Sequence, residues 1–183
     1  MTRAAVQPPP GGRDLGTFQV TALVILRMLI GWHFMYEGLA KITNPYWTSA
    51  GYLQAAQGWF SEAFIAVSAN PGLLTAVDHL NAWGLLLIGL ALLVGVFERV
   101  AAWAGILLLA LYYLATPPFP GLEYAIPAEG SYLIVNKQLI ELAALLVILG
   151  FPTAGRVGLK RWVDRILEPG RTGAAAAAEG GAP

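Results

Sequence analysis

Four apolar stretches separated by polar segments predict four membrane-spanning helices. They cover approximately residues 20–42, 81–97, 100–115 and 132–150. A helix of about 20 residues rises about 30 Å, which is the thickness of the hydrocarbon core of a bilayer. Glycines in the second and third stretches would let helices approach closely in lipid: Gly84, Gly89, Gly95 and Gly105. The predicted fold class is therefore an all-α membrane protein, with a four-transmembrane-helix bundle over residues 17–152.

The segments outside these stretches predict surface elements. In the first loop, residues 43–80, apolar side chains recur at helical spacing between turn signals. This pattern predicts an interfacial amphipathic helix, which either packs at the lipid edge or covers a membrane-embedded site. Residues 153–168 combine an apolar face with a basic one, which predicts an amphipathic helix on the cytoplasmic membrane surface. Residues 1–16 are rich in proline and glycine, and residues 169–183 contain an alanine run and several glycines. Both segments are predicted to be disordered.

The basic residues near the ends of the spans predict the topology. They precede the first span, lie between the second and third, and follow the fourth: Arg3, Arg13, Arg99, Arg156, Lys160, Arg161 and Arg165. The loops 43–80 and 116–131 carry mainly acidic residues. By the positive-inside rule, both termini are cytoplasmic and these two loops face outward.

The composition supports membrane insertion and excludes several kinds of chemistry. Of the 183 residues, 57% are hydrophobic and 12% are charged, and the formal net charge is zero. This composition is typical of an integral membrane protein and gives no reason to expect nucleic acid as a partner. The chain has no cysteine, so it has neither disulfides nor cysteine-ligated iron–sulfur or zinc sites. Phosphate-binding glycine loops, nucleophile elbows and HExxH motifs are also absent from the sequence.

Charged residues interrupt the first and fourth apolar stretches. The first contains Arg27, His33, Glu37 and Lys41, and the fourth contains Asn136, Lys137, Gln138 and Glu141. At about 100° per residue, the charges of the first stretch share one side of the helix. Since a charge facing lipid is costly, we expect cross-helix pairs at matching depths. The expected pairs are Arg27 with Glu141 near the midplane and Glu37 with Lys137 in the outer half, with Lys41 and Asn81 at the outer mouth.

These polar residues have two explanations. In one, the pairs only fix helix register and subunit association. In the other, they form a polar pocket for a quinone headgroup or another small polar ligand with a ring. The candidate binding residues are Arg27, His33, Glu37, Lys41, Asn136, Lys137 and Glu141, and Trp32, Trp83, Tyr112 and Tyr113 are available for ring contacts. Glu37 and Glu141 are the candidate catalytic residues, as acceptors of protons.

Haem or metal binding by this chain alone is not expected. Two axial ligands of one haem lie at similar depth in the membrane. His33 and His79 are predicted to differ in depth by roughly 9 Å along the membrane normal at 1.5 Å per residue.

The sequence resembles the DoxX/DoxD family of small four-helix bacterial membrane proteins. The matching features are R-x3-G-x2-F-x2-E-G-x2-K over Arg27–Lys41, G-x4-G-x5-G-x2-ER over Gly84–Arg99, and LIVNKQLIELAAL over Leu133–Leu145. The family takes its name from a membrane subunit of thiosulfate:quinone oxidoreductase. The resemblance implies a quinone-linked redox subunit in the bacterial cytoplasmic membrane, in contact with lipid and with other subunits of a membrane redox complex.

Three functions remain open from the sequence. The first is a membrane subunit that binds quinone or anchors a quinone-reactive partner. The second is a non-catalytic accessory subunit that packs against a larger membrane complex and stabilises it. The third, a small-solute transporter, is less favoured because the four spans show neither an inverted repeat nor a broken helix.

Overall fold

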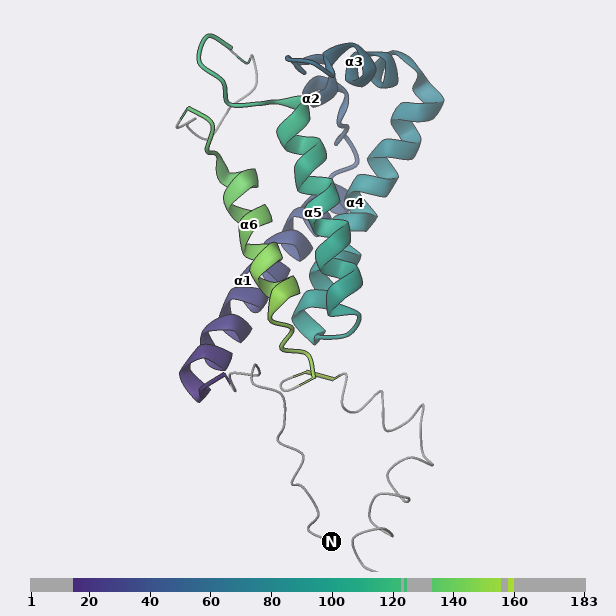
Figure 1. Ribbon diagram of the computed structural model, residues 1–183. Helices are drawn as coiled ribbons and strands as arrows, with labels where there is room; N and C mark the ends of the chain where they lie inside the picture. Colours follow the sequence, from purple (N-terminus) through teal and green to yellow (C-terminus); the bar gives the residue numbers. More distant parts are fainter. Residues whose placement is uncertain (1–14, 123, 125–132, 156–157, 160–183) are drawn as a thin grey trace, which may run out of the picture.

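The computed structural model describes residues 15–122, 124, 133–155 and 158–159, and within them the chain is all-helical with no strand. Figure 1 shows the arrangement of the helices. Their bounds are α1 Thr17–Thr43, α2 Ala50–Gln54, α3 Ser61–Ala69, α4 Pro71–Val94, α5 Glu98–Ala115 and α6 Lys137–Gly150. Three of them, α1, α4 and α5, are long and apolar enough to cross a membrane. The prediction of an all-α membrane protein is thus confirmed.

The second and fourth predicted spans begin at different residues from those expected. The second was expected at residue 81, but α4 starts at Pro71, because the Asn70 side chain accepts hydrogen bonds from the backbone of Gly72 and Leu73. The fourth was expected at residue 132, but α6 starts at Lys137 and has 14 residues. At 1.5 Å per residue, α6 rises only about 21 Å, so a fourth complete span stays a prediction.

The first loop contains two short helices, α2 and α3, in place of the one amphipathic helix expected there. Asp78 of α4 fixes the start of this loop by accepting hydrogen bonds from the Ser49 amide and the Thr48 hydroxyl, both at 2.8 Å. At the other side of the loop, the Gln57 amide donates to the Ala115 carbonyl at the end of α5. These bonds hold the loop against the ends of α4 and α5, and its position at a membrane interface stays a prediction.

Most of the predicted terminal segments lie outside the described residues. This applies to residues 1–14 of the first tail, to 169–183, and to the predicted surface helix 153–168 apart from 153–155 and 158–159.

Helices α1 and α4 touch backbone to backbone. A Cβ added at Gly38 would meet backbone atoms of Ala82 and Leu86, and one added at Gly89 would meet backbone atoms of Met35 and Gly31. Small residues allow helices in lipid to approach this closely and to gain packing energy. The expectation of close packing is therefore confirmed for Gly89 but wrong for Gly84, where nothing lies within 4 Å.

The core lies where α1, α4, α5 and α6 meet (Figure 1). Phe34 of α1 is its largest fully buried apolar side chain, and Gly105 of α5 leaves the space for its ring, since a Cβ there would lie 3.0 Å from Phe34 Cε2. The other large, fully buried side chains of this core are Leu92, Leu145 and Ile148. The packing of Phe34 in this core fixes the position of α1, and with it the positions of the polar residues that follow Phe34 in that helix.

Candidate functional site

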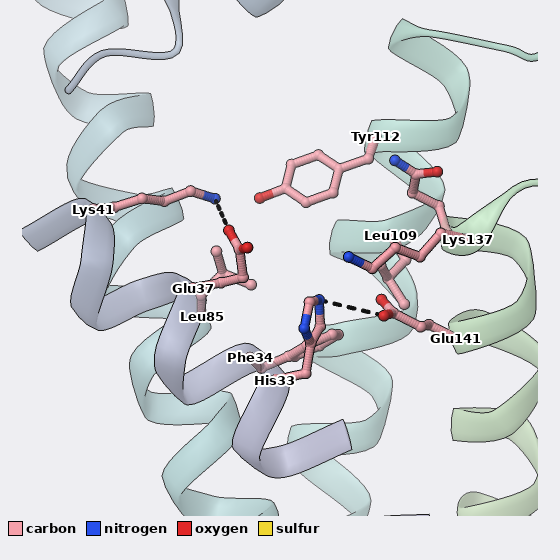
Figure 2. A pocket seen from close by; sticks show the side chains of 10 residues that line it. His33, Phe34, Glu37, Lys41, Leu85, Leu109, Tyr112, Lys137 and Glu141 are labelled. Carbon is pink, nitrogen blue, oxygen red and sulfur yellow. Dashed lines mark ion pairs between the residues drawn. The ribbon is translucent and has the colours of Figure 1, made fainter. Parts of the chain in front are cut away.

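A cavity of about 140 Å³ lies between α1, α4, α5 and α6. Figure 2 shows that charged side chains from α1 and α6 point into it from opposite sides. Its lining consists of His33, Phe34, Glu37, Lys41, Leu85, Leu109, Tyr112, Lys137, Gln138 and Glu141. It includes five of the seven predicted binding residues. The structure therefore brings together both candidate catalytic carboxylates, Glu37 and Glu141, around one space.

Lys41 is held in the cavity by contacts from several elements. Its ammonium lies 3.7 Å from Glu37 Oε2 and donates to Asn81 Oδ1 at 3.2 Å. It also lies 5.2 Å from the centroid of the Trp47 ring and 5.7 Å from that of Tyr112, within the range of cation–π attraction. These contacts come from α1, α4, α5 and the loop after α1. Lys41 is therefore a fixed hydrogen-bond donor at one end of the cavity.

A hydrogen-bonded network behind Lys41 orients its partners. Asn81 Nδ2 donates to the Tyr112 hydroxyl at 2.6 Å, which leaves Asn81 Oδ1 facing Lys41. Tyr52 of α2 donates to the Tyr112 carbonyl at 2.9 Å, and its hydroxyl lies 2.7 Å from the Thr116 hydroxyl. Burial raises the pKa of Tyr52, so its hydroxyl stays protonated near neutral pH. The first loop is in this way connected to the cavity wall.

The second ion pair of the cavity joins α1 to α6. His33 Nε2 lies 3.3 Å from Glu141 Oε1, and the two side chains are 33% and 18% exposed. Figure 2 shows this pair at the side of the cavity away from Lys41. The pair therefore places an imidazole nitrogen and a carboxylate oxygen next to each other at the cavity.

The inner wall and the mouth of the cavity differ in character. The inner wall is formed by Phe34, Leu85 and Leu109, which all belong to the buried core. The mouth lies between α1 and α6, where the Glu37 side chain is 46% exposed and Lys137 is exposed. The inner wall is thus an apolar floor, and the charged groups around the mouth form a polar rim. A floor and a rim of this kind suit a ligand whose ring is apolar and whose substituents are polar.

Arg27 lies in a separate polar cluster, and its expected pairing with Glu141 is wrong. Its Nη1 donates to Thr153 Oγ1 at 3.0 Å and lies 3.9 Å from Glu98 Oε2. Thr153 follows the end of α6, whereas Glu141 is in its second turn, more than 13 Å away at about 1.5 Å per residue. Arg27 therefore cannot reach both. The carboxylate partner of Arg27 is Glu98 instead of Glu141, because the turn after α4 places Glu98, at the start of α5, at the same level as Arg27.

The backbone after α6 completes this second cluster. Glu98 accepts hydrogen bonds from the Thr153 and Ala154 amides, at 3.2 Å and 2.6 Å. Arg27 and Glu98 are 2% and 3% exposed, so the cluster is closed to solvent and to ligands. It contributes to the fold, and Arg27 does not line the cavity.

The remaining predicted residues take different positions at the start of α6. Asn136 caps the helix, because its side chain accepts a hydrogen bond from the Leu139 amide at 3.0 Å. Lys137 and Gln138 line the cavity. Glu37, expected to pair with Lys137, has its ion pair at 3.7 Å with Lys41 on its own helix, although Lys137 faces the same space.

Sequence reasoning missed the apolar floor, and it placed Asn81 beside Lys41 at the outer mouth without predicting the hydrogen bond that joins them. Asn81 is an amide in an otherwise apolar stretch, and this was a usable signal, because a buried amide needs hydrogen-bonding partners. Leu85 and Leu109 gave no signal, since leucines of the floor and leucines facing lipid look alike in a sequence. Among the residues that the structure describes, no group of three or more His, Cys, Asp or Glu residues could hold a metal ion.

The comparisons with known proteins identify the family. The family model named DoxX matches residues 22–117, more than half of the chain. The chain belongs to the DoxX family. No curated protein and no solved structure gave a match. The region matched by the DoxX model runs from α1 to just beyond the end of α5, so it contains Glu37, Lys41 and the cavity floor, while the side of the cavity formed by α6 lies outside it.

Proposed function

We propose that this DoxX-family protein is a membrane subunit of a quinone-linked oxidoreductase or electron-transfer assembly, and that its cavity receives the quinone headgroup. One observation carries the proposal: two ion pairs, Lys41–Glu37 and His33–Glu141, face an accessible cavity of about 140 Å³ with an apolar floor. Intramembrane ionisable residues that line a cavity are typical of functional sites.

The chemistry of the lining residues fits a quinone. The two carbonyl oxygens of a quinone accept hydrogen bonds, and the ring carries hydroxyl donors once it is reduced. The cavity offers lysine donors, Lys41 and Lys137, and carboxylate acceptors, Glu37 and Glu141. A bound quinone would supply a two-electron acceptor, and since the chain has no cysteine, the electrons would come from a bound organic cofactor or from a partner subunit.

The residues of this chain have separable roles in the proposal. Lys41, held by Glu37 and Asn81, positions one end of the headgroup. His33 Nε2 holds a proton next to Glu141 and exchanges it at the other end. The buried floor excludes water from the ring, which strengthens the polar contacts at the rim.

The experiment compares the native assembly with charge-removing variants. The protein is isolated with its native partners from membranes, and its quinone content and quinone-reductase activity are measured. Glu37→Gln and Lys137→Met remove charges from the cavity rim and should lower bound quinone and activity at least tenfold. Glu62→Gln, the same change on the exposed surface of α3, should leave both unchanged.

The second candidate function is a non-catalytic accessory subunit. The observation in its favour is that the charges are already paired within the chain, with Lys41 bonded to Glu37 and Asn81 and His33 next to Glu141. If both cavity variants assemble normally and keep full quinone content and activity, the charges serve the fold alone, and the accessory role replaces the quinone site.

A further inference from the structure

Resting on the proposed function, we infer that the cavity selects quinones whose headgroup is a single six-membered ring and rejects those with two fused rings. The inference concerns the chemical class of the ligand, and it depends on the size of the cavity, the rigidity of its floor and the position of its mouth.

The size of the cavity matches one ring. A buried protein cavity of about 150 Å³ holds one benzene molecule, whereas larger ligands occupy sites of about 300–1,000 Å³. The cavity between α1, α4, α5 and α6 has about 140 Å³. One six-membered ring fills this volume, and a fused second ring has to find its space elsewhere.

The floor cannot move aside to provide that space. Phe34, Leu85 and Leu109 are 1%, 3% and 3% exposed and belong to the packed core. Behind Phe34, α5 approaches so closely that a Cβ at Gly105 would lie 3.0 Å from the ring. Protein interiors are packed as densely as organic crystals, so enlarging this floor requires the core to be rearranged.

The mouth determines which edge of the headgroup meets the floor. The exposed members of the lining, Glu37 and Lys137, place the opening between α1 and α6 (Figure 2). The long apolar tail of a quinone must leave through this opening. In a two-ring quinone the fused ring is on the edge opposite the tail, so it would point into Phe34, Leu85 and Leu109.

The rim does not discriminate between the two classes. Lys41 and His33 are eight positions apart on α1, about 12 Å along the helix axis, which leaves room between them for one ring with a polar group at each end. The para carbonyls are the same in one-ring and two-ring quinones, so contacts of the rim with them are equivalent. Selection therefore comes from the floor.

The test measures binding to the full chain in lipid nanodiscs by quenching of tryptophan fluorescence, since Trp47 is in contact with Lys41. The two probes are a decyl-trimethyl-benzoquinone and a decyl-methyl-naphthoquinone, which share the tail and the carbonyls and differ in the carbons that close the second ring. We expect the one-ring probe to bind at least about tenfold more tightly, since one misplaced methylene already costs about 10-fold or more in a tight pocket.

Variants of α5 connect this ratio to the floor. Leu109→Ala enlarges the floor and should bring the ratio of the two affinities close to one, and the milder Leu109→Val should shift it partway. Leu107→Ala removes the same atoms from the 64% exposed outer side of α5 and should leave the ratio unchanged. A ratio that both Leu109 variants leave unchanged would overturn the inference.

Two further outcomes separate this inference from the proposed function. If both probes bind the wild type equally and Lys41→Met weakens both, ring-size selection is wrong and the quinone site stands. If neither probe binds, or if Lys41→Met changes neither affinity, the quinone site and the inference both fail.

Discussion

Arg27 illustrates how a charge is accommodated in an apolar helix. Its guanidinium is 2% exposed and has Glu98 and the Thr153 hydroxyl as partners, and Glu98 in turn accepts two backbone amides. A buried ion pair adds little net stability compared with apolar residues, but removing one partner leaves a costly charge behind. The pair therefore determines which arrangements of α1, α5 and the chain after α6 are allowed.

The first prediction concerns this pair. Glu98→Ala leaves Arg27 without its carboxylate and should lower the free energy of unfolding by about 3–5 kcal/mol. The double variant Arg27→Met with Glu98→Ala should recover part of the loss, measured by thermal unfolding in detergent. If the double variant is as unstable as the sum of the two single variants, the two residues are not coupled.

A second prediction separates capping from ligand binding at Asn136. Asn136→Ala removes the acceptor for the Leu139 amide and should cost about 1 kcal/mol of stability. Asn136→Ser keeps an oxygen that can cap the helix and should retain most of it. Quinone content should stay at the wild-type level in the serine variant, and its loss there would assign Asn136 to the ligand.

At the scale of the helices, the contact of α1 with α4 is set by glycines and not by large apolar side chains. Gly31 and Gly38 of α1 and Gly89 of α4 face the opposing backbone. Lipid competes with apolar side chains for contact, so close backbone packing supplies the specificity that the hydrophobic effect does not.

The third prediction uses two glycines of α4 as a matched pair. Gly89→Val places its side chain against the backbone of Met35 and should prevent the packing of α1 on α4, with loss of folded protein. Gly84→Val introduces the same side chain where nothing lies within 4 Å, so its stability should change by less than about 0.5 kcal/mol. Equal effects of the two substitutions, measured as folded yield and melting temperature, would contradict the packing role.

The helices that could be predicted from the sequence are those with a continuous apolar pattern. The first and third stretches agree with α1 and α5 to within three residues. The start of α4 was missed because residues 71–80 include Thr75, Asp78 and His79, which interrupt the apolar pattern. The cap by Asn70 and the proline after it were visible in the sequence but were interpreted only as a turn.

The candidate site could be predicted as a set of residues but not as a set of pairs. The polar-pocket hypothesis grouped His33, Glu37, Lys41, Lys137 and Glu141, and the structure places all five around one cavity. The estimate for Arg27 failed because it considered partners only within the spans, and Glu98 lies between the predicted second and third spans. Glu98 is instead covered by Thr153 and Ala154, a contact between segments distant in the sequence that no local pattern reveals.

At the scale of the whole molecule, α1 packs mainly on α4, and α6 packs mainly on α5. The Lys41–Glu37 pair lies within the first of these two units, whereas the His33–Glu141 pair crosses from one unit to the other. The cavity lies between the units, so a small change in their spacing would alter its mouth without unfolding either unit.

The fourth prediction tests the topology of the whole chain. The natural sequence has no cysteine, so single cysteines introduced at Ala5, Gly121 and Ala177 report their own accessibility. By the positive-inside rule, an impermeant thiol reagent applied to intact cells should label only the cysteine at Gly121. All three should react after the membrane is permeabilised. Labelling of either terminal position in intact cells would reverse the orientation.

The long-range contacts of α1 have a consequence for biosynthesis. Helix α1 leaves the ribosome first, carrying Arg27 and Lys41, but Asn81 follows 40 positions after Lys41 and Thr153 follows 126 positions after Arg27. Until those residues are made, Arg27 lacks the Thr153 hydroxyl and Lys41 has Glu37 of its own helix but not Asn81, and exposure of charge to lipid is costly. Helix α1 therefore enters the membrane at a disadvantage that only the later part of the nascent chain removes.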